Sequence, residues 1–205
     1  MFYRFIRQVA RFVVFLLNGN ARYTNKERLP KEEAYILVGP HRTWFDPIYF
    51  ALAGTPTIFS FMAKQELFKN PILRWILVHA NAFPVDRENP GPSVIKKPVK
   101  FLKEGNLSLI MFPSGTRHSN DLKGGAATIA KLSGAPIVPA VFQGPLTIKG
   151  LLSRKRVTVN FGEPIYLDKK VKLTKETLKD IEDQMQAAFD QLDAEIDPNY
   201  KYEAK

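Results

Sequence analysis

Cysteine is absent from this sequence of 205 residues. Its absence excludes disulfide bonds, metal sites built on thiolates and catalysis by a cysteine nucleophile. It is compatible with a cytosolic protein without establishing one. Tracts rich in glycine, serine and proline, internal repeats and low-complexity runs are also missing, so no linker is expected. With 45% hydrophobic residues, the chain is long enough to build one substantial core.

Acidic residues are few relative to basic ones. The 30 Lys and Arg against 20 Asp and Glu give a net charge of +10 and an isoelectric point near 9.7. Such a surplus indicates an anionic partner, which is a nucleic acid, an anionic membrane surface or a phosphate-bearing substrate. Because no known nucleic-acid-binding motif accompanies the charge, a basic nucleic-acid-binding module is kept only as an alternative.

Long apolar runs are lacking too. Arg4, Arg7 and Arg11 interrupt the N-terminal stretch, which therefore falls short of the roughly 20 apolar residues of a transmembrane helix. The stretch also has no small-residue cleavage site of the signal-peptide kind. On a helical wheel the three arginines fall within about 60° of one another. The opposite side holds Phe2, Phe5, Ile6, Val9, Phe12, Val13, Leu16 and Leu17.

A basic edge beside an aromatic-rich apolar face is typical of a helix lying in the membrane interface. We therefore expect residues 1–20 to form an amphipathic membrane-docking helix, with its arginines available to anionic headgroups, and residues 21–205 to form one domain. The alternative is a helix that packs on the core of this domain.

Short apolar runs alternate with helical patterns along the rest of the chain. Strands are expected at residues 34–38, 57–62, 82–85, 107–112, 137–142 and 157–161. Helices are expected at residues 45–53, 71–78, 93–105 and 126–132, and from 174 to 197. Ser93 should cap the third of these helices and Pro98 should kink or shorten it.

This alternation predicts an α/β fold with a mixed, largely parallel sheet flanked by helices. In such sheets the functional loops follow the carboxyl ends of the strands. Chemistry is therefore expected in segments 39–46, 85–88 and 113–123.

The first segment holds His41, one of only three histidines, and Asp46 five residues later. Five residues is the wrong spacing for one helical face, but the two side chains can pair if His41 lies in a loop and Asp46 in the first turn of the next helix. A carboxylate that accepts from one ring nitrogen leaves the other nitrogen to take a proton from a hydroxyl. The alternative is a capping box over residues 43–46, in which Asp46 satisfies backbone amides.

The other two segments offer cations and turn amides. Arg87 follows a strand, although an arginine beside Asp86 is also the pattern of a surface ion pair. Residues 112–117 run from a strand into a turn whose amides, hydroxyl and guanidinium suit a phosphate; an ordinary exposed turn is the alternative. The P-loop ending Gly-Lys-Ser/Thr is missing. Ser114 also lacks the flanking glycines of a nucleophile elbow.

Together these segments resemble the lysophosphatidic acid acyltransferases of the glycerolipid acyltransferase superfamily. His41 and Asp46 match the His-x4-Asp motif of that family. Residues 82–87, 112–117 and 137–140 match its Arg-ending, Phe-Pro-Glu-Gly-Thr-Arg and Val-Pro blocks, and residues 63–67 its Ala-Lys-x-Glu-Leu segment. The run from 86 to 92 is similar to Gram-positive bacterial members. Two residues depart from the pattern, Pro40 in place of Asn and Ser114 in place of Glu.

The resemblance implies transfer of a fatty acyl group from acyl carrier protein (acyl-ACP) or acyl-CoA to the sn-2 hydroxyl of lysophosphatidic acid. The product would be phosphatidic acid for phospholipid biosynthesis, made by a peripheral or monotopic protein on an anionic membrane surface at the cytoplasmic face of the cell membrane. No metal or cofactor is required, because a thioester is already activated.

The same resemblance implies roles for individual residues. His41 and Asp46 would be the catalytic pair. The substrate phosphate would be bound by Arg87, Arg117 and Lys64, and the acceptor and oxyanion loop would consist of Ser114, Gly115 and Thr116. Two alternatives within enzyme chemistry stay open, a different lysophospholipid acceptor and a serine hydrolase with Ser114 as nucleophile.

Overall fold

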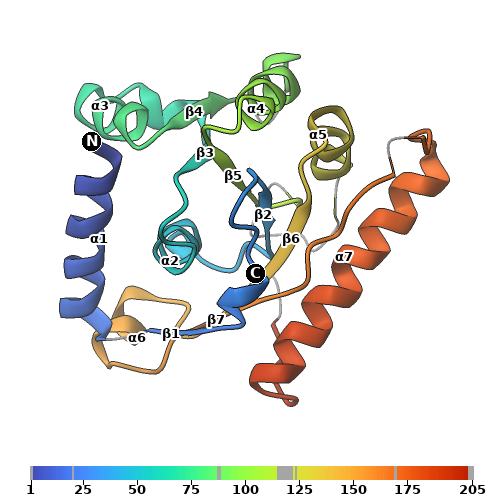
Figure 1. Cartoon of the computed structure of the whole chain (residues 1–205). Coiled ribbons are helices and arrows are strands. Elements are labelled where there is room, and N and C mark those ends of the chain that lie inside the picture. Colours follow the sequence, from blue (N-terminus) through green and yellow to red (C-terminus); the bar gives the residue numbers. More distant parts are fainter. Residues whose placement is uncertain are drawn as a thin grey trace.

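A seven-stranded sheet lies at the centre of the computed structural model, which describes residues 2–19, 21–86, 89–114, 122, 124–168 and 170–202 (Figure 1). Its strands are β1 (Arg22–Thr24), β2 (Ile36–Val38), β3 (Phe59–Lys64), β4 (Ala82–Val85), β5 (Ser108–Met111), β6 (Ile137–Gln143) and β7 (Thr158–Phe161). The order across the sheet is β1-β7-β6-β2-β5-β3-β4. Only the β6–β7 pair is antiparallel among these strands. The predicted mixed, largely parallel sheet is confirmed.

Helices cover both faces of the sheet (Figure 1). One face carries α1 (Phe2–Asn18), α2 (Asp46–Ala53) and α6 (Ile148–Leu152), and the other carries α4 (Ser93–Lys103), α5 (Gly125–Ser133) and α7 (Lys175–Ile196). The remaining helix, α3 (Pro71–His79), packs beside the edge strand β4. Two short 3-10 helices are η1 (Lys26–Arg28) and η2 (Gln65–Phe68).

The central strands are buried on both faces, which explains their continuous apolar sequence. In β2, Leu37 belongs to the hydrophobic cluster on the α2 side, whereas Ile36 and Val38 belong to the cluster on the α5 and α7 side. Helix α7 joins the second cluster through an apolar stripe, of which Ile181, Met185, Phe189 and Leu192 are buried. Two layers of helices around one sheet thus form the core.

Every strand and helix predicted from the apolar pattern is present, but some elements carry no such pattern. Strand β1 is short and polar, and it is held at the sheet edge by pairing with β7 and by a 2.8 Å hydrogen bond from Thr24 Oγ1 to Asn160 Oδ1. The apolar pattern also does not predict helix α6. The prediction that Ser93 caps α4 is wrong, since Pro92 occupies the cap position and no side chain bonds there. The helix runs through Pro98 to Lys103.

Helix α1 is anchored to the domain by its polar edge. Arg7 is only 9% exposed, and its Nη1 donates hydrogen bonds to the carbonyl oxygens of Pro56 (3.2 Å) and Thr57 (2.8 Å). At the other end of the helix, Asn18 Nδ2 donates to the carbonyl oxygens of Leu151 (3.0 Å) and Lys155 (2.9 Å). The expectation that all three arginines are available to headgroups is therefore wrong for Arg7, because its guanidinium already donates hydrogen bonds to carbonyl oxygens of the protein.

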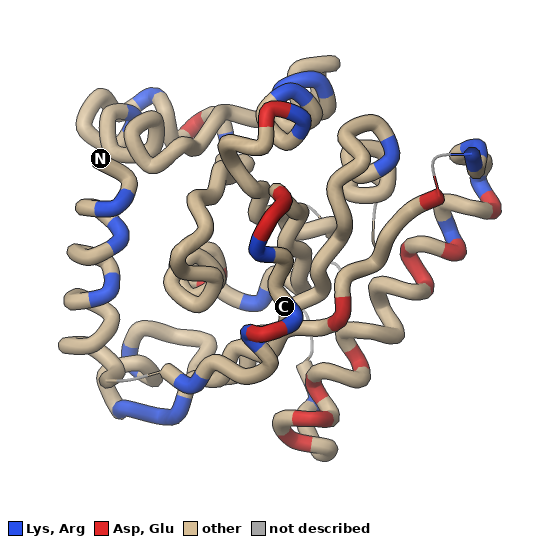
Figure 2. Tube along the Cα trace, in the orientation of Figure 1, with Lys and Arg blue, Asp and Glu red and all other residues tan. Residues whose placement is uncertain are grey.

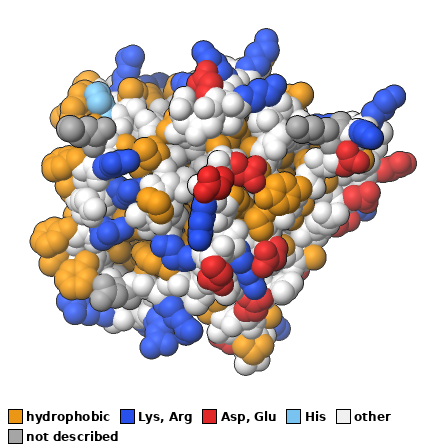
Figure 3. Space-filling model, in the orientation of Figure 1, with side chains coloured by type: hydrophobic (Ala, Val, Ile, Leu, Met, Phe, Trp, Pro, Cys, Tyr) orange, Lys and Arg blue, Asp and Glu red, His pale blue; other side chains and the backbone are white. Residues whose placement is uncertain are grey.

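The opposite face of α1 points away from the protein. Its exposed apolar side chains include Phe5 (63%), Phe12 (61%) and Leu16 (55%), and hydrophobic side chains gather along this edge of the surface in Figure 3. Tyr3, on the inner side of the helix, belongs to the core cluster, so α1 packs on the domain along one side and exposes this apolar face on the other. Across the described part of the chain, no helix has the length and apolar character required to cross a bilayer.

Candidate active site

The loops that follow β2, β3, β4 and β5 leave the sheet at one edge, because these strands are parallel neighbours. His41 follows β2, Lys64 ends β3, Asp86 follows β4 and Ser114 follows β5. The predicted gathering of these segments at the carboxyl edge is therefore confirmed for the described residues. Four residues with predicted roles lie outside the described residues, and their roles stay predictions: Arg87, Gly115, Thr116 and Arg117.

His41 and Asp46 form the pair that their spacing predicted. Nδ1 of His41 lies 3.2 Å from Oδ2 of Asp46, and the Asp46 side chain is fully buried while the His41 side chain is 11% exposed. His41 lies in the loop and Asp46 is the first residue of α2. When Nδ1 carries the proton, it donates to the carboxylate, and Nε2 keeps a lone pair that can accept a proton.

The Asp46 carboxylate also organises the loop backbone. Oδ2 accepts hydrogen bonds from the amides of Arg42 (2.6 Å) and Thr43 (2.7 Å), and Oδ1 accepts from Oγ1 of Thr43 (2.5 Å). Phe45, the residue before α2, makes no side-chain cap. Asp46 thus satisfies backbone amides, as the capping alternative proposed, and contacts His41 as well. The two interpretations are compatible, because the carboxylate has lone pairs enough for both tasks.

Gly39 and Phe112 shape the space around His41. A Cβ atom on Gly39 would lie 2.5 Å from the carbonyl oxygen of Ala140 and 2.6 Å from the Phe50 ring, so only glycine allows β2 to lead into the loop on this path. The ring of His41 stacks on Phe112 with centroids 4.2 Å apart and an interplanar angle of 20°. The imidazole is therefore held against a flat apolar surface.

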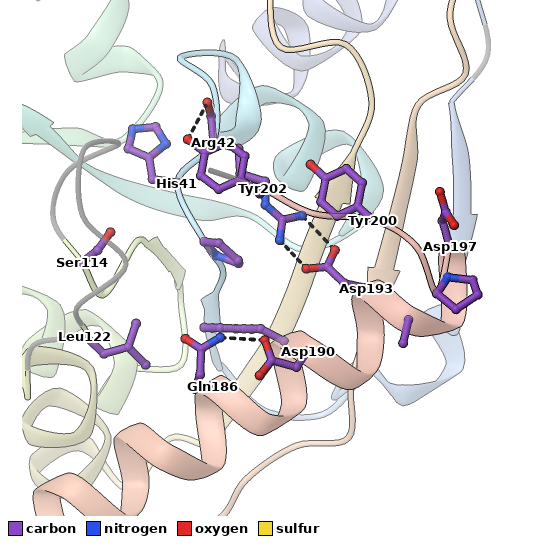
Figure 4. A pocket seen from close by; sticks show the side chains of 14 residues that line it. His41, Arg42, Ser114, Leu122, Gln186, Asp190, Asp193, Asp197, Tyr200 and Tyr202 are labelled. Carbon is purple, nitrogen blue, oxygen red and sulfur yellow. Dashed lines mark hydrogen bonds and ion pairs between the residues drawn. The ribbon is translucent and has the colours of Figure 1, made fainter. Parts of the chain in front are cut away.

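Two cavities are lined by His41. The larger, about 520 Å³, lies among α1, α2, α3 and β3 and is bounded by mostly apolar side chains such as Ile6, Ile48, Met62 and Leu77. The smaller, about 240 Å³, is polar and includes Ser114, Gln186, Asp190 and Asp193. Figure 4 shows this second cavity, with side chains of α7 opposite the His41 loop. His41 is thus accessible from an apolar side and from a polar side.

Lys64 lines the apolar cavity together with His41. Its Nζ atom lies 3.3 Å from Oε1 of Glu66, and both side chains are well exposed (48% and 41%). The structure therefore brings this predicted phosphate ligand to the site with a carboxylate beside it. Ser114 is buried at 4% exposure and lines the polar cavity.

Arg42 is a site residue that sequence reasoning missed. Its guanidinium is paired with Asp193 of α7, and the rings of Tyr200 and Tyr202 lie beside it. Burial alone lowers the pKa of Arg42, but the hydrogen bonds and charge of Asp193, followed by Tyr200 and Asp46, outweigh burial and raise it. No local spacing could have linked Arg42 to Asp193, because 151 positions separate them.

Comparison with known proteins agrees with this geometry. A family model described as Acyltransferase matches residues 20–143. The chain is 50% identical over 196 residues to the 1-acyl-sn-glycerol-3-phosphate acyltransferase of Streptococcus pneumoniae, covering 95% of this chain and 74% of that protein. It is 45% identical over 156 residues to the Bacillus subtilis protein of the same name, covering 75% of this chain and 78% of that protein.

A solved structure shows the same fold. The crystal structure of the 1-acyl-sn-glycerophosphate (LPA) acyltransferase PlsC from Thermotoga maritima matches with a TM-score of 0.72 at 21% identity, over 98% of this chain and 81% of that chain. The family match spans the strands and loops that carry His41, Asp46, Lys64 and Ser114. The chain therefore belongs to the 1-acyl-sn-glycerol-3-phosphate acyltransferase family, as its motifs predicted.

Proposed function

We propose that this chain transfers a fatty acyl group from acyl-ACP or acyl-CoA to the sn-2 hydroxyl of lysophosphatidic acid, forming phosphatidic acid, with His41 as the catalytic base. The observation that carries the proposal is the contact of His41 Nδ1 with the buried carboxylate of Asp46, beside an apolar cavity of about 520 Å³. An oriented base next to space for an acyl chain is what this reaction requires.

The chemistry follows from the arrangement of this pair. Nε2 of His41 takes the proton of the acceptor hydroxyl while the hydroxyl oxygen attacks the thioester carbonyl carbon. The tetrahedral intermediate then expels the thiolate, and the imidazolium gives the proton to the departing sulfur. Asp46 holds the tautomer that the first step needs and stabilises the imidazolium between the two steps. A thioester needs no prior activation, so no covalent enzyme intermediate is invoked.

The acceptor phosphate is assigned to the cations at the carboxyl edge of the sheet. Lys64 supports this assignment because it lines the same cavity as His41. Arg87 and Arg117 follow β4 and β5, which border β3 in the same sheet, and are included for that reason. A bound phosphate would place the hydroxyl near Nε2, and the backbone amides of residues 114–116 are the groups we assign to stabilising the developing oxyanion.

The acyl chain is assigned to the apolar cavity. Side chains of α1 and α3, among them Ile6 and Leu77, line it together with α2 and β3. The same two helices expose apolar residues to the outside, including Ile72 (73%), Trp75 (53%) and Val78 (50%) on α3, and no residue of α3 is buried. Phe2 joins the helices, since its ring lies 4.8 Å from that of Trp75.

We define the exposed apolar surface of α1 and α3 as the lipid-facing surface, which includes Phe5, Phe12, Leu16, Ile72, Trp75 and Val78. We propose that this surface lies in the bilayer interface. Both the lysolipid and its product reside in membranes, so a cavity bordered by these helices would receive its substrate directly from the bilayer. This proposal places the protein at the cytoplasmic face of the cell membrane, as a peripheral or monotopic protein.

An acyl-transfer assay tests the function. Purified protein in vesicles would be offered acyl-ACP or acyl-CoA with lysophosphatidic acid, and in parallel with lysophosphatidylcholine and lysophosphatidylglycerol. We expect phosphatidic acid from at least one donor, and a loss of about 10³-fold or more in His41→Ala. Normal turnover by folded His41→Ala would refute the base assignment, and preference for another lysolipid would refute the acceptor. An acyl group trapped on Ser114 would instead support the serine hydrolase alternative.

A further inference from the structure

Arg42, the neighbour of His41 in the loop, is buried and bound by several groups. Its residue is 8% exposed, and Nη1 donates to the carbonyl oxygen of Phe142 at 2.7 Å. The Asp193 carboxylate receives Nη1 on Oδ1 (2.9 Å) and Nη2 on Oδ2, a two-point ion pair visible in Figure 4. Such fork-to-carboxylate contacts determine the orientation of a guanidinium as well as its place.

Asp193 is itself held from the sheet. Nε2 of Gln143, the last residue of β6, donates to Oδ1 of Asp193 (2.8 Å) and to its carbonyl oxygen (2.9 Å). The carboxylate that orients Arg42 is thus tied to both α7 and β6. Because α7 and β6 are packed elements of the core, the ion pair holds Arg42 and its loop in a fixed position.

The segment after α7 adds two aromatic rings. Cζ of Arg42 lies 4.9 Å from the ring centroid of Tyr200 and 5.4 Å from that of Tyr202. The Tyr202 hydroxyl also lies 3.5 Å from the carbonyl oxygen of Arg42. Helix α7 ends at Ile196, so these rings reach the His41 loop because the chain turns back after Pro198. Rings at these distances attract a guanidinium and shield its ion pair from water.

We infer that Arg42 is a positioning residue for His41, and that Asp193, Tyr200 and Tyr202 form a clamp that holds it. The inference rests on the proposed role of His41 as base. The backbone amide of Arg42 donates to the Asp46 carboxylate at 2.6 Å. Residue 42 therefore links two parts of the protein, the carboxylate that orients His41 and the C-terminal part of the chain. Displacing a catalytic group by about 1 Å costs on the order of 10²-fold in rate. The clamp restricts that displacement.

Paired tyrosine variants test the clamp with a matched control. Tyr200→Leu with Tyr202→Leu removes both rings, whereas Tyr200→Phe with Tyr202→Phe keeps them. We expect the Leu pair to lower kcat by about 10- to 100-fold, with KM for lysophosphatidic acid and for the thioester changed by less than about twofold. The Phe pair lacks only the hydroxyls, of which that of Tyr202 lies 3.5 Å from the Arg42 carbonyl oxygen, and should lose much less kcat than the Leu pair. Circular dichroism and a thermal melt would verify that both pairs are folded at the assay temperature.

A double-mutant cycle of Arg42→Ala and Asp193→Ala, in those variants that fold, should show losses in kcat that are not additive. A Leu pair with the parent kcat would overturn the inference. So would a loss confined to the KM of one substrate, because the tyrosines would then belong to a binding wall. The parallel His41→Ala variant separates the two proposals: if it is inactive while the Leu pair is normal, only the clamp is refuted, and if it is active, the proposed base is refuted as well.

Discussion

At the scale of single residues, Asp46 performs two tasks with its two oxygens. Oδ2 faces the amides of Arg42 and Thr43 and the ring of His41, and Oδ1 faces the Thr43 hydroxyl. A hydroxyl can either donate or accept, whereas backbone amides can only donate. An asparagine can therefore keep its carbonyl oxygen toward the amides and turn its NH2 group toward Thr43.

This asymmetry makes Asp46→Asn an informative variant. The loop should keep its conformation, but His41 would face a neutral oxygen that stabilises an imidazolium poorly. We expect kcat to fall by about 10² to 10⁴-fold while KM changes little. Steady-state kinetics of Asp46→Asn, His41→Ala and the double variant would measure this. The double variant should be no slower than His41→Ala, since the two residues act as one unit. If the loss of kcat in the double variant equalled the product of the two single losses, that coupling would be contradicted.

At the scale of elements, α1 and α3 each expose several large apolar side chains. Helix α1 binds the domain through Arg7 and Asn18, and α3 buries none of its residues. The rings of Phe2 and His79 lie 4.9 Å apart, so the two helices meet at one end. An apolar surface of this kind is unfavourable in water and is stabilised by contact with lipid.

Charged substitutions on the lipid-facing surface should therefore release the protein from membranes. We expect Phe5→Asp with Phe12→Asp, or Ile72→Asp with Trp75→Asp, to weaken binding to vesicles by at least about tenfold, because each buried apolar side chain contributes roughly 1.5–3 kcal/mol. The control pair, Leu132→Asp with Val171→Asp, replaces exposed apolar residues on the other side of the sheet. Co-sedimentation with vesicles decides the question. If only the α1 pair loses binding, α3 does not belong to the lipid-facing surface.

At the scale of the whole molecule, charge is unevenly distributed. Figure 2 shows Asp and Glu gathered along α7, while Lys and Arg follow α1 and α4. Near the lipid-facing surface, Arg4, Lys69 and Arg74 are exposed, and Lys172, Lys175 and Lys179 are exposed just before and within the first turns of α7. A net charge of +10 distributed in this way favours one orientation on an anionic surface.

Neutralising charges next to the lipid-facing surface should weaken binding in proportion to their number. Changing Arg4, Lys69 and Arg74 to Gln should cost about 1 kcal/mol per residue on vesicles containing phosphatidylglycerol at low salt, and less at high salt. The same change at Lys172, Lys175 and Lys179 removes equal charge from the far side and should have a smaller effect. Vesicle binding titrated against ionic strength measures both triplets. Equal losses in the two would show that net charge alone, and not its placement, attracts the protein.

Much of this molecule can be predicted from the sequence because the relevant patterns are local. Strands such as β2 and β5 are short apolar runs between turns, and the stripe of α7 repeats every three or four residues. Parallel strands bring their carboxyl ends to one edge, so the meeting of His41, Lys64 and Ser114 follows from the element order. The His41–Asp46 contact spans only five positions. Periodicity, turn residues and short spacing are sufficient for each of these features.

Other features were decided by the tertiary structure alone. The sequence of an amphipathic helix does not show which of its sides faces the protein, and contacts distant in sequence, such as those of Arg7 with the carbonyl oxygens of Pro56 and Thr57, determine that α1 turns Arg7 inward. The antiparallel pairing of β7 depends on its neighbour β6, since a strand has no intrinsic direction in a sheet. The clamp on Arg42 joins positions 151 apart through Asp193. Local sequence can specify which groups are available, but contacts over such separations exist only once the sheet and α7 have packed together.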